Sequence, residues 1–281
     1  MKFRRYDNVD AFKADVFDVL LEDEVCNNLP ISILTDSGEY GAGDWLMCTV
    51  TDWLGKIILV ALCVKPFNLL IYETENNRNN SSVKLLVREL KRENYDPPGV
   101  FAVTELARRF AKLFYGDIDN MSKMSMVLMQ LDELAPYNKA SGYFRLLSDE
   151  DLVFTPYWEQ AFCTDCGIPA FTLEENKERI RTRVGKDSHF IWEDGLPVAQ
   201  AVYGRSTPNG AVINWVYTPP LYRGRGYATS VVAEVSQSLF DRGKRFCCLF
   251  ADADNPTSRG VYRKLGYYDV CEFEQIQLDT A

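Results

Sequence analysis

The sequence predicts a mixed α/β protein with two domains, residues 1–137 and residues 138–281. A chain of 281 residues is longer than one ordinary domain. Turn-forming residues, among them Pro136 and Gly142, separate two regions in which hydrophobic residues recur with the periods of helices and strands. The two regions also show a similar order of predicted elements, which suggests a duplicated fold.

The C-terminal region has the predicted order β-α-α-β-β-β-α-β-α-β. Asp194-Gly195 is a turn signal that joins two strands in a hairpin. An apolar stripe predicts a helix near residues 226–242, and Asn255 followed by Pro256 marks the start of another. The predicted strands are 143–147, 189–192, 197–203, 211–217, 246–251 and 267–278, and the predicted helices are 149–162, 173–184, 226–242 and 255–265.

The N-terminal region repeats this order less clearly. Residues 76–82, which lead from a strand into a helix, contain no glycine. We therefore expect that this region binds no pyrophosphate and is structural. The predicted helices are 9–25, 82–92 and 105–115, and the predicted strands are 45–50, 56–64, 68–73, 100–103 and 125–131.

The composition disfavours several classes of function. The net charge is 31 − 40 = −9, which argues against a surface that holds nucleic acid or anionic lipid. The longest apolar run, residues 57–64, is too short to span a bilayer, and residues 1–10 lack the apolar core of a signal peptide. We expect a cytoplasmic protein with no nucleic-acid partner and no membrane partner.

The eight cysteines and the single histidine do not predict a metal site. We expect the thiols to stay reduced in the cytoplasm. Cys163 and Cys166 form a C-x-x-C pair, but no second pair accompanies them, so we expect small buried side chains and no metal. We expect the lone histidine, His189, to be structural.

The segment from Val216 to Thr229 leads from a strand through a glycine-rich turn into a helix. The first amides of a helix have no intrahelical partners and carry the positive end of the helix dipole. Gly224 and Gly226 let an anion approach the backbone, and Arg223 and Arg225 add positive charge. These features predict a pyrophosphate site. A dinucleotide motif would need a third glycine, and a P-loop motif is absent, so the other interpretation is a plain loop with two turn glycines.

Residues Arg223 to Ala228, RGRGYA, resemble the R/Q-x-x-G-x-G/A phosphate motif of the GNAT superfamily of acyl-CoA N-acyltransferases. Asn255 to Tyr267 is similar to the superfamily's N-x-x-S/A-x-x-x-Y-x-K-x-G-F/Y segment. The resemblance covers roughly the C-terminal half, and the paired layout is similar to a bacterial subgroup in which a degenerate GNAT-like domain comes first. It implies a GNAT fold, with a mixed, mostly antiparallel sheet flanked by helices, and acetyl-CoA as co-substrate without a metal.

The resemblance also implies where acetyl-CoA binds. The strand 213–217 would separate from the strand 246–251 and leave a slot for the pantetheine arm, whose amides would pair with backbone groups of Val216 and Thr218. Amides of the turn would hold the pyrophosphate, and Asn255, assisted by Ser258, would contact the arm from the other side. The implied cofactor-binding residues are Val216, Tyr217, Thr218, Arg223, Gly224, Arg225, Gly226, Tyr227, Ala228, Thr229, Asn255 and Ser258.

Tyr262 is the candidate catalytic residue. Asn255, Ser258 and Tyr262 are three and four residues apart, so they share one face of a helix. According to the resemblance, this face looks at the sulfur end of the slot, where the tyrosine would protonate the departing thiolate. A thiol and a phenol differ by about 1.5 pKa units, so the proton transfer is expected to be nearly balanced. The other interpretation is an interior aromatic residue of an amphipathic helix.

The general base stays open. Members of the superfamily often carry a glutamate on the strand that corresponds to 211–217, which has no acid here. Asp252, Asp254 and Glu159 are alternatives, although each is expected to be a solvated charge, and a chain of waters is another.

Four aromatic residues are candidates either for an acceptor pocket or for the core: Trp158, Phe162, Tyr203 and Trp215.

The resemblance implies an N-acetyltransferase that transfers an acetyl group directly to a primary amine of a small molecule or peptide. The alternative is a CoA-binding sensor or scaffold without turnover, which the missing strand acid favours. The sequence leaves the acceptor and the oligomeric state open.

Overall fold

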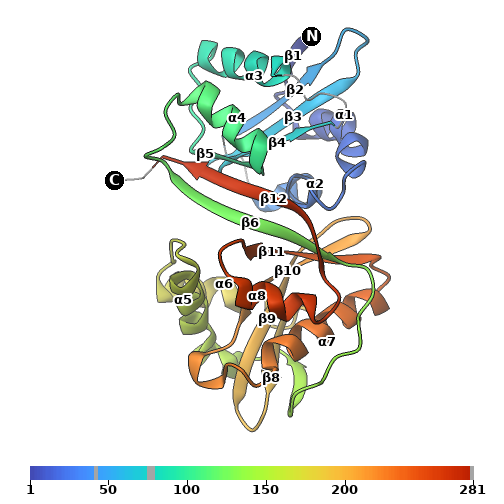
Figure 1. Cartoon of the computed structure of the whole chain (residues 1–281), viewed down its shortest axis with the longest axis vertical. Coiled ribbons are helices and arrows are strands. Elements are labelled where there is room, and N and C mark those ends of the chain that lie inside the picture. The colour runs from blue at the N-terminus through green and yellow to red at the C-terminus, as the bar shows by residue number, and fades with distance from the viewer. Residues whose placement is uncertain (41–43, 75–79, 279–281) are drawn as a thin grey trace. The chain divides into compact units, whose positions relative to one another are not determined.

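The computed structural model describes residues 1–40, 44–74 and 80–278, and the chain divides into two compact units. The first unit contains Met1–Leu128 together with the residues from Val270 on, and the second contains Met129–Asp269. Two strands, β6 (Ser122–Leu131) and β12 (Tyr268–Gln277), run from one unit into the other (Figure 1). The compact units thus differ from the predicted domains in the place of residues 129–137 and of most of β12, and independent folding of either domain stays a prediction.

The first unit is a sheet covered by helices on both faces. Its strands follow the order β1-β2-β3-β4-β5-β12-β6, in which β4 and β5 are parallel and the pairs β1-β2, β2-β3, β3-β4 and β5-β12 are antiparallel. The elements introduced here are β1 (Lys2–Arg5), β2 (Trp45–Thr51), β3 (Ile57–Val64), β4 (Leu69–Glu73), β5 (Gly99–Val103), α1 (Val9–Leu21), α2 (Asn28–Thr35), α3 (Ser81–Arg92), α4 (Thr104–Phe114) and the 3₁₀ turn η1 (Ser37–Tyr40).

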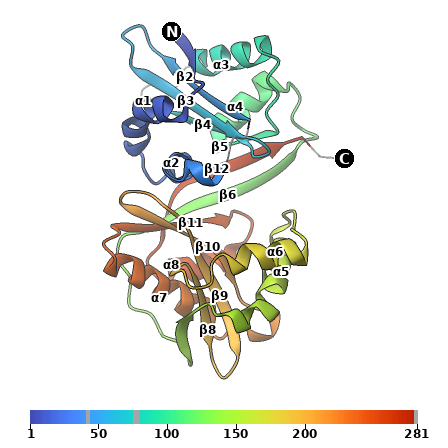
Figure 2. The ribbon, with the colours of Figure 1, turned by 180° about the vertical axis from the view of Figure 1, so that it is seen from behind.

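The apolar side chains of β3 pack into cores on both faces of this sheet. Leu59, Ala61 and Cys63 pack into a core with α3 and α4, whereas Val60 and Leu62 pack into a second core with α1 and α2 (Figures 1 and 2). Successive side chains of a strand point to opposite faces, so a strand buried on both sides is continuously apolar.

Most of the predicted elements of this unit are present, but β1 and α2 were not predicted. The helix expected at 9–25 ends at Leu21, and a separate helix follows at Asn28–Thr35. Pro30 made this second helix difficult to predict, because a proline inside a helix usually breaks it. Here Pro30 lies in the first turn, where proline is tolerated. The glycine-free segment 76–82 falls mostly outside the described residues, which omit 75–79.

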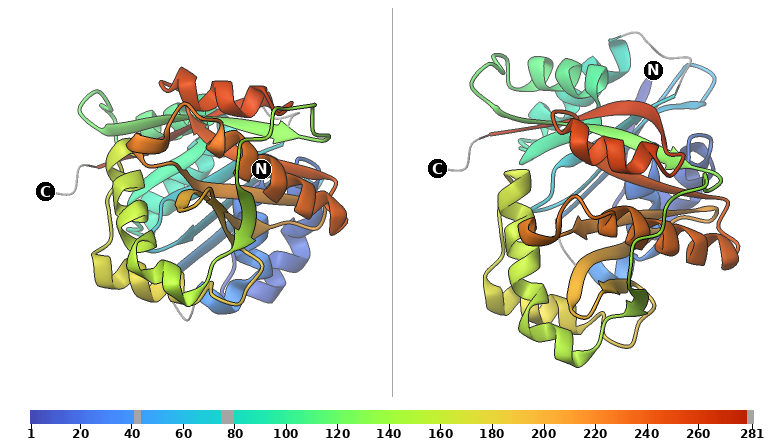
Figure 3. Two further views of the ribbon diagram at one scale, coloured as in Figure 1. Left: turned by 90° about the horizontal axis from the view of Figure 1, so that it is seen from below. Right: turned by 60° about the horizontal axis from the view of Figure 1, so that its bottom comes forward.

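The elements from β7 to β12 confirm the predicted order of the C-terminal region, and all but most of β12 lie in the second unit. Its strands follow the order β11-β10-β9-β8-β7, with only β10 and β11 parallel. Helices α5 and α6 cover one face and α7 the other (Figure 3). The elements are β7 (Tyr143–Leu146), β8 (His189–Glu193), β9 (Pro197–Ser206), β10 (Gly210–Tyr217), β11 (Phe246–Asp252), α5 (Thr155–Cys166), α6 (Leu173–Arg181), α7 (Tyr227–Asp241), α8 (Pro256–Arg263) and the 3₁₀ turns η2 (Asp149–Val153) and η3 (Pro220–Tyr222).

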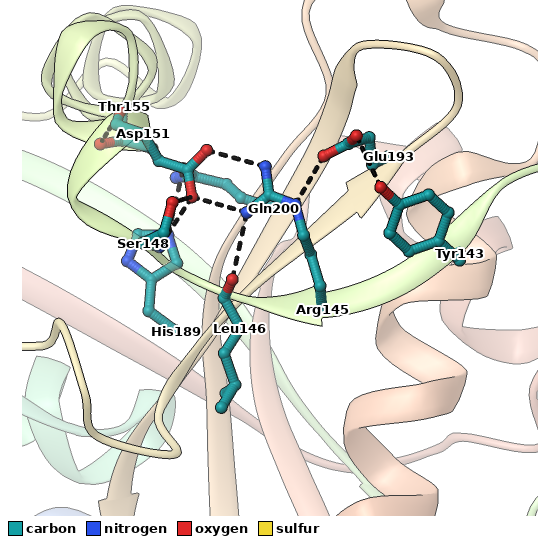
Figure 4. Close-up of polar contacts among 9 residues, drawn as sticks. All are labelled: Tyr143, Arg145, Leu146, Ser148, Asp151, Thr155, His189, Glu193 and Gln200. Atoms are coloured by element: carbon teal, nitrogen blue, oxygen red, sulfur yellow. Dashed lines mark hydrogen bonds and ion pairs between the residues drawn. The ribbon is translucent and has the colours of Figure 1, made fainter.

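A polar network fixes the start of α5 to the sheet (Figure 4). Arg145 on β7 donates to Asp151 on η2 at 2.6 and 2.8 Å and to Glu193 on β8 at 2.6 Å. Burial raises the pKa of Asp151, but the bonds from Arg145 and from the Ser148 backbone outweigh it, so the pKa lies below its usual value. The network therefore stays charged at neutral pH and joins β7 and η2, which are neighbours along the chain, to β8, whose Glu193 lies 48 residues after Arg145.

His189 is a buried structural residue, as predicted. Its Nε2 lies 3.3 Å from Oε1 of Gln200, and the side chain is fully covered (Figure 4). Burial, with a smaller contribution from Arg183, lowers the pKa of His189 to about 3.

No helix among the described residues is long and apolar enough to cross a bilayer.

The buried imidazole predicts a pH-dependent stability. A histidine whose folded pKa lies below its unfolded value of about 6.5 takes up its proton in the unfolded chain, so acid favours unfolding. From pH 6.5 to 4.5 we expect the wild type to lose about 2.3 kcal/mol of unfolding free energy relative to His189→Gln. Urea titrations across this range measure the difference, and His189 is the single histidine of the chain. Parallel curves for the two proteins would contradict the assignment.

Candidate functional site

The second unit contains a cavity of about 960 Å³. It is lined by the end of α5, by β10 and the turn that follows, by the first residues of α7, and by the end of β11 with α8. All of the predicted cofactor-binding residues line it except Arg225, and so does Tyr262. The fold therefore brings together residues that lie far apart in the sequence, whereas their roles stay predictions.

The cavity exists because β10 and β11 separate. Their parallel pairing extends from Gly210 and Phe246 only as far as Val212 and Cys248. On its other side, the register of β10 against β9 shifts twice, between Val212 and Ile213 and between Asn214 and Tyr217. Irregularities of this kind bend a strand and increase its twist. The expected separation of these two strands is thus present.

Trp215 lies within the second irregularity and has a φ of 50°, which is uncommon for a residue other than glycine. Its ring packs 5.0 Å from the ring of Phe162 on α5, and the guanidinium of Arg179 lies 5.7 Å from its centre. These contacts from α5 and α6 cover the ring of a residue with an unfavourable backbone conformation. Phe162 and Trp215 line the cavity.

The other two aromatic candidates for the acceptor pocket, Trp158 and Tyr203, are not among the lining residues of the cavity. Trp158 instead packs against Phe154 and Tyr217, with ring centres 4.6 and 6.1 Å away.

The glycine-rich turn opens the start of α7 toward the cavity. Gly224 and Gly226 have φ values of 78° and 83°, a region that favours glycine. Gly226 caps α7 without a side-chain hydrogen bond, so no cap side chain satisfies the first amides of the helix. A Cβ atom on Gly224 would meet nothing within 4 Å. Exposed amides, a helix N-terminus and open space beside them are suited to an anion.

Arg223 does not project freely into this space. Its Nη2 donates to Asp165 on α5 at 2.5 Å, and its Nε donates to the carbonyl of Thr218 at 2.9 Å. Both charged side chains are about half exposed, so their ion pair contributes little to stability. An incoming anion would compete with Asp165 for this arginine.

The facing wall is α8. The Oδ1 atom of Asn255 accepts from the amide of Ser258 at 3.0 Å and caps the helix, which leaves the amide nitrogen of Asn255 for other partners. Ser258 and Tyr262 follow on the same face. The two interpretations of Tyr262 are therefore compatible, because the residue is only 8% exposed and also lines the cavity.

The expected proton transfer from Tyr262 stays a prediction. Burial raises the pKa of Tyr262 to about 12, although a hydrogen bond with Ser258 opposes the shift. The phenol is thus a weaker acid than a free tyrosine, and the same burial would also raise the pKa of a thiol placed beside it. The hydroxyl keeps its proton at neutral pH and serves better as a hydrogen-bond donor.

The three candidate bases have different surroundings. Asp252 lines the cavity and accepts from the amide of Asp254 at 2.9 Å, and Asp254 is exposed, as expected. The prediction of a solvated Glu159 is wrong, because this side chain is fully buried and paired with Arg183. Arg183 lies after α6, and nothing in the local sequence of α5 indicates that it approaches from there.

Two polar oxygen atoms of the lining residues are buried without a hydrogen-bond partner among the described residues: Asn214 Oδ1 and Thr218 Oγ1. Gly204 on β9 makes room for the first, since a Cβ atom there would lie 2.3 Å from Nδ2 of Asn214. A buried oxygen without a partner is costly unless a ligand or water supplies a donor.

Sequence analysis did not identify Cys166 or Asp165 as lining residues. The spacing could have indicated Cys166, because it lies four residues after Phe162 and thus on the same helix face. Asp165 gives no such signal, since its place depends on the contact with Arg223. Among the described residues, no group of three histidine, cysteine or acidic side chains could hold a metal ion.

Comparisons with known proteins agree with this geometry. Residues 195–275, which include β10, the glycine-rich turn and α8, match the FR47-like protein family. A GNAT-family acetyltransferase from Colwellia psychrerythraea is 12% identical, with a TM-score of 0.60 over 99% of this chain and 100% of its own. A GCN5-related N-acetyltransferase from Sphaerobacter thermophilus is 18% identical, with a TM-score of 0.64 over 98% and 94%. This chain is a two-lobe protein with the GNAT fold.

The two-lobe arrangement also occurs in a solved tandem GNAT protein from the clavulanic acid biosynthesis pathway. That protein is 15% identical, with a TM-score of 0.59 over 100% of this chain and 99% of its own. No curated protein matches the sequence. In this chain, the second lobe contains the cavity, and the first lobe is a separate compact unit of strands and helices.

The open turn predicts that a side chain at Gly224 blocks anion binding. We expect Gly224→Val to weaken the binding of coenzyme A at least tenfold, because the added side chain fills the space beside the exposed amides. Titration calorimetry measures the affinity. Gly185→Val is the matched control, since Gly185 also has a positive φ, 73°, and open space around it but lies outside the cavity. Equal affinities in the two variants would contradict the prediction.

Proposed function

We propose that the second lobe is an N-acetyltransferase that transfers the acetyl group of acetyl-CoA to a primary amine of a small molecule or peptide. The observation that carries this proposal is that one cavity joins the separated edge of β10, the N-terminus of α7 and Tyr262. Acetyl-CoA matches these three features: its diphosphate suits the N-terminus of α7, its long arm suits the edge of β10, and its thioester would lie near Tyr262. The GNAT fold supports acyl transfer as the class of reaction.

The residues of the cavity fit coenzyme A at both ends of the slot. Thr218 Oγ1 is a buried acceptor without a partner among the described residues, next to the backbone groups proposed to pair with the pantetheine amides. At the other end, open space lies beside Gly224, close to the first amides of α7. Asn255 would contact the arm from α8 with its amide nitrogen. When bound, acetyl-CoA supplies the acyl thioester, and these residues hold it extended along β10.

Tyr262 would assist the departure of sulfur as a hydrogen-bond donor. Its high pKa keeps the hydroxyl protonated, so the hydrogen bond strengthens as negative charge develops on the sulfur. The proton that finally neutralises the thiolate would come from the attacking amine, whose nitrogen becomes more acidic as it bonds to the carbonyl carbon. This arrangement avoids a free tyrosinate in a buried place.

The acceptor must attack as the neutral amine, because a protonated nitrogen has no lone pair for attack. The cavity-lining carboxylates among the described residues are Asp165, which pairs with Arg223, and Asp252. We assign Asp252 as the relay that passes the amine's first proton to solvent, since it stands at the end of β11 and is exposed. Neither the strand β10 nor Glu159 supplies a base here.

Removal of the Tyr262 hydroxyl tests the assigned role. We expect Tyr262→Phe to lower kcat about 100-fold and to leave the affinity for acetyl-CoA unchanged, because the hydroxyl acts on the transition state. Steady-state kinetics with calorimetry in parallel separate the two quantities. Tyr267→Phe is the matched control, since Tyr267 is also a buried tyrosine, bonded to Ser236 at 3.0 Å, and is not a lining residue of the cavity. Similar losses in both variants would point to packing instead.

The reaction itself is tested with a panel of primary amines. We expect free coenzyme A to appear from acetyl-CoA only when an acceptor is present, and weakly basic amines to react faster at neutral pH, because more of each is unprotonated. A thiol reagent measures the release, and mass spectrometry identifies the acetylated amine. Binding of coenzyme A without release for any amine would favour the alternative, a CoA-binding sensor or scaffold.

A further inference from the structure

Two cysteines of the first lobe, distant in sequence, are in direct contact. The Sγ atoms of Cys26 and Cys271 lie 3.2 Å apart, although 245 residues separate them along the chain. Cys26 lies in the turn between α1 and α2, and Cys271 is the fourth residue of β12. Both are free thiols and both are partly exposed. Both also belong to the first compact unit, so the contact lies inside one lobe.

Cys26 and Cys271 differ from the other six cysteines in their surroundings. Cys48, Cys63, Cys163, Cys247 and Cys248 are buried, where an oxidant has poor access. Cys166 is partly exposed like the pair, but it lies in the other lobe and lines the cavity. Cys26 and Cys271 therefore combine accessibility with a neighbouring sulfur, which a disulfide requires.

The two thiols have different roles in such a reaction. The hydrogen bond with Cys271, burial and the nearby carboxylate of Asp23 all raise the pKa of Cys26. The raised pKa keeps Cys26 protonated at neutral pH, so we assign the second attack to Cys26. The acidic surroundings make the reaction slow, because the thiolate is the reactive form.

We propose that Cys26 and Cys271 are the site of a reversible intramolecular disulfide, formed by a disulfide oxidant such as oxidised glutathione. The Cys271 thiolate attacks one sulfur of the oxidant and releases one glutathione thiolate. Cys26 then loses its proton and attacks the Cys271 sulfur of the mixed disulfide, which releases the second glutathione. In total, the two protein thiols lose two hydrogen atoms and one oxidised glutathione becomes two reduced glutathiones.

The disulfide would tie β12 to the helical turn of the first lobe. Cys271 lies two residues before the ladder that joins β12 to β5, which begins at Phe273 and Val103. The bond would close a loop of nearly the whole chain, so it would restrict the unfolded state strongly. This inference does not depend on the proposed acyl transfer.

Peptide mapping of the full-length protein tests the proposal. The folded protein is incubated with oxidised or reduced glutathione, the remaining thiols are alkylated, and the digest is analysed without reduction. We expect one cross-linked peptide pair containing Cys26 and Cys271 only after oxidation, and its loss in Cys26→Ser and in Cys271→Ser. Cys166 is the internal control and should carry only a glutathione adduct or the alkyl group. Separate adducts on Cys26 and Cys271 at saturation would overturn the proposal.

Thermal unfolding provides the second readout. The oxidised wild type should unfold at a higher temperature than the reduced protein, and added dithiothreitol should reverse the shift. The Cys26→Ser/Cys271→Ser double variant should show one unfolding temperature under both conditions, which also reports that it folds. A cross-link that forms only in urea, or a shift that persists in the double variant, would show that the native contact is not the reacting pair.

Discussion

The second lobe depends on one interruption of backbone pairing, the separation of β10 and β11 beyond Val212 and Cys248. Buried backbone groups must find partners, so an opening inside a sheet is costly unless something else occupies it. In this lobe the register shifts of β10 against β9 and the positive φ of Trp215 produce the opening. The same bend directs the chain into the glycine-rich turn and places the start of α7 at the end of the slot. The cavity and the anion-binding turn therefore have one structural cause.

The opening requires rigid surroundings, and two charged contacts provide them. Glu159 is fully buried in α5 and pairs with Arg183, while Arg145 joins η2 to β7 and β8 through Asp151 and Glu193. Breaking a buried pair such as Glu159–Arg183 commonly costs about 3–5 kcal/mol, because it leaves a charge without a partner. This pair holds α5 against the residues that follow α6, and the Arg145 contacts hold η2 against the sheet. Helix α5 carries Phe162 and Cys166 into the wall of the cavity.

The sequence predicted the features of this lobe that depend on local chemistry. The cap at Asn255, the spacing from Asn255 to Tyr262 and the two turn glycines each follow from a few neighbouring residues. The features that it missed depend on distant partners. Arg183 buries the charge of Glu159, Asp165 engages Arg223, and β12 places Cys271 beside Cys26 in the first lobe. Neither helical nor strand periodicity contains information about such contacts.

The surroundings of Tyr262 limit how the proposed reaction can be accelerated. With its raised pKa this tyrosine is a weaker acid than a free phenol, so a full proton transfer to a thiolate would be harder. Correct placement of two reactants can supply about 7–11 kcal/mol, and one well-placed hydrogen bond to developing charge about 3–4 kcal/mol. In the proposed mechanism, positioning along β10 and hydrogen bonding from the neutral tyrosine would therefore contribute more than strong acid–base catalysis. A site of this kind gains more from the shape of its slot than from a carboxylate on β10, which is consistent with the absence of an acid from that strand.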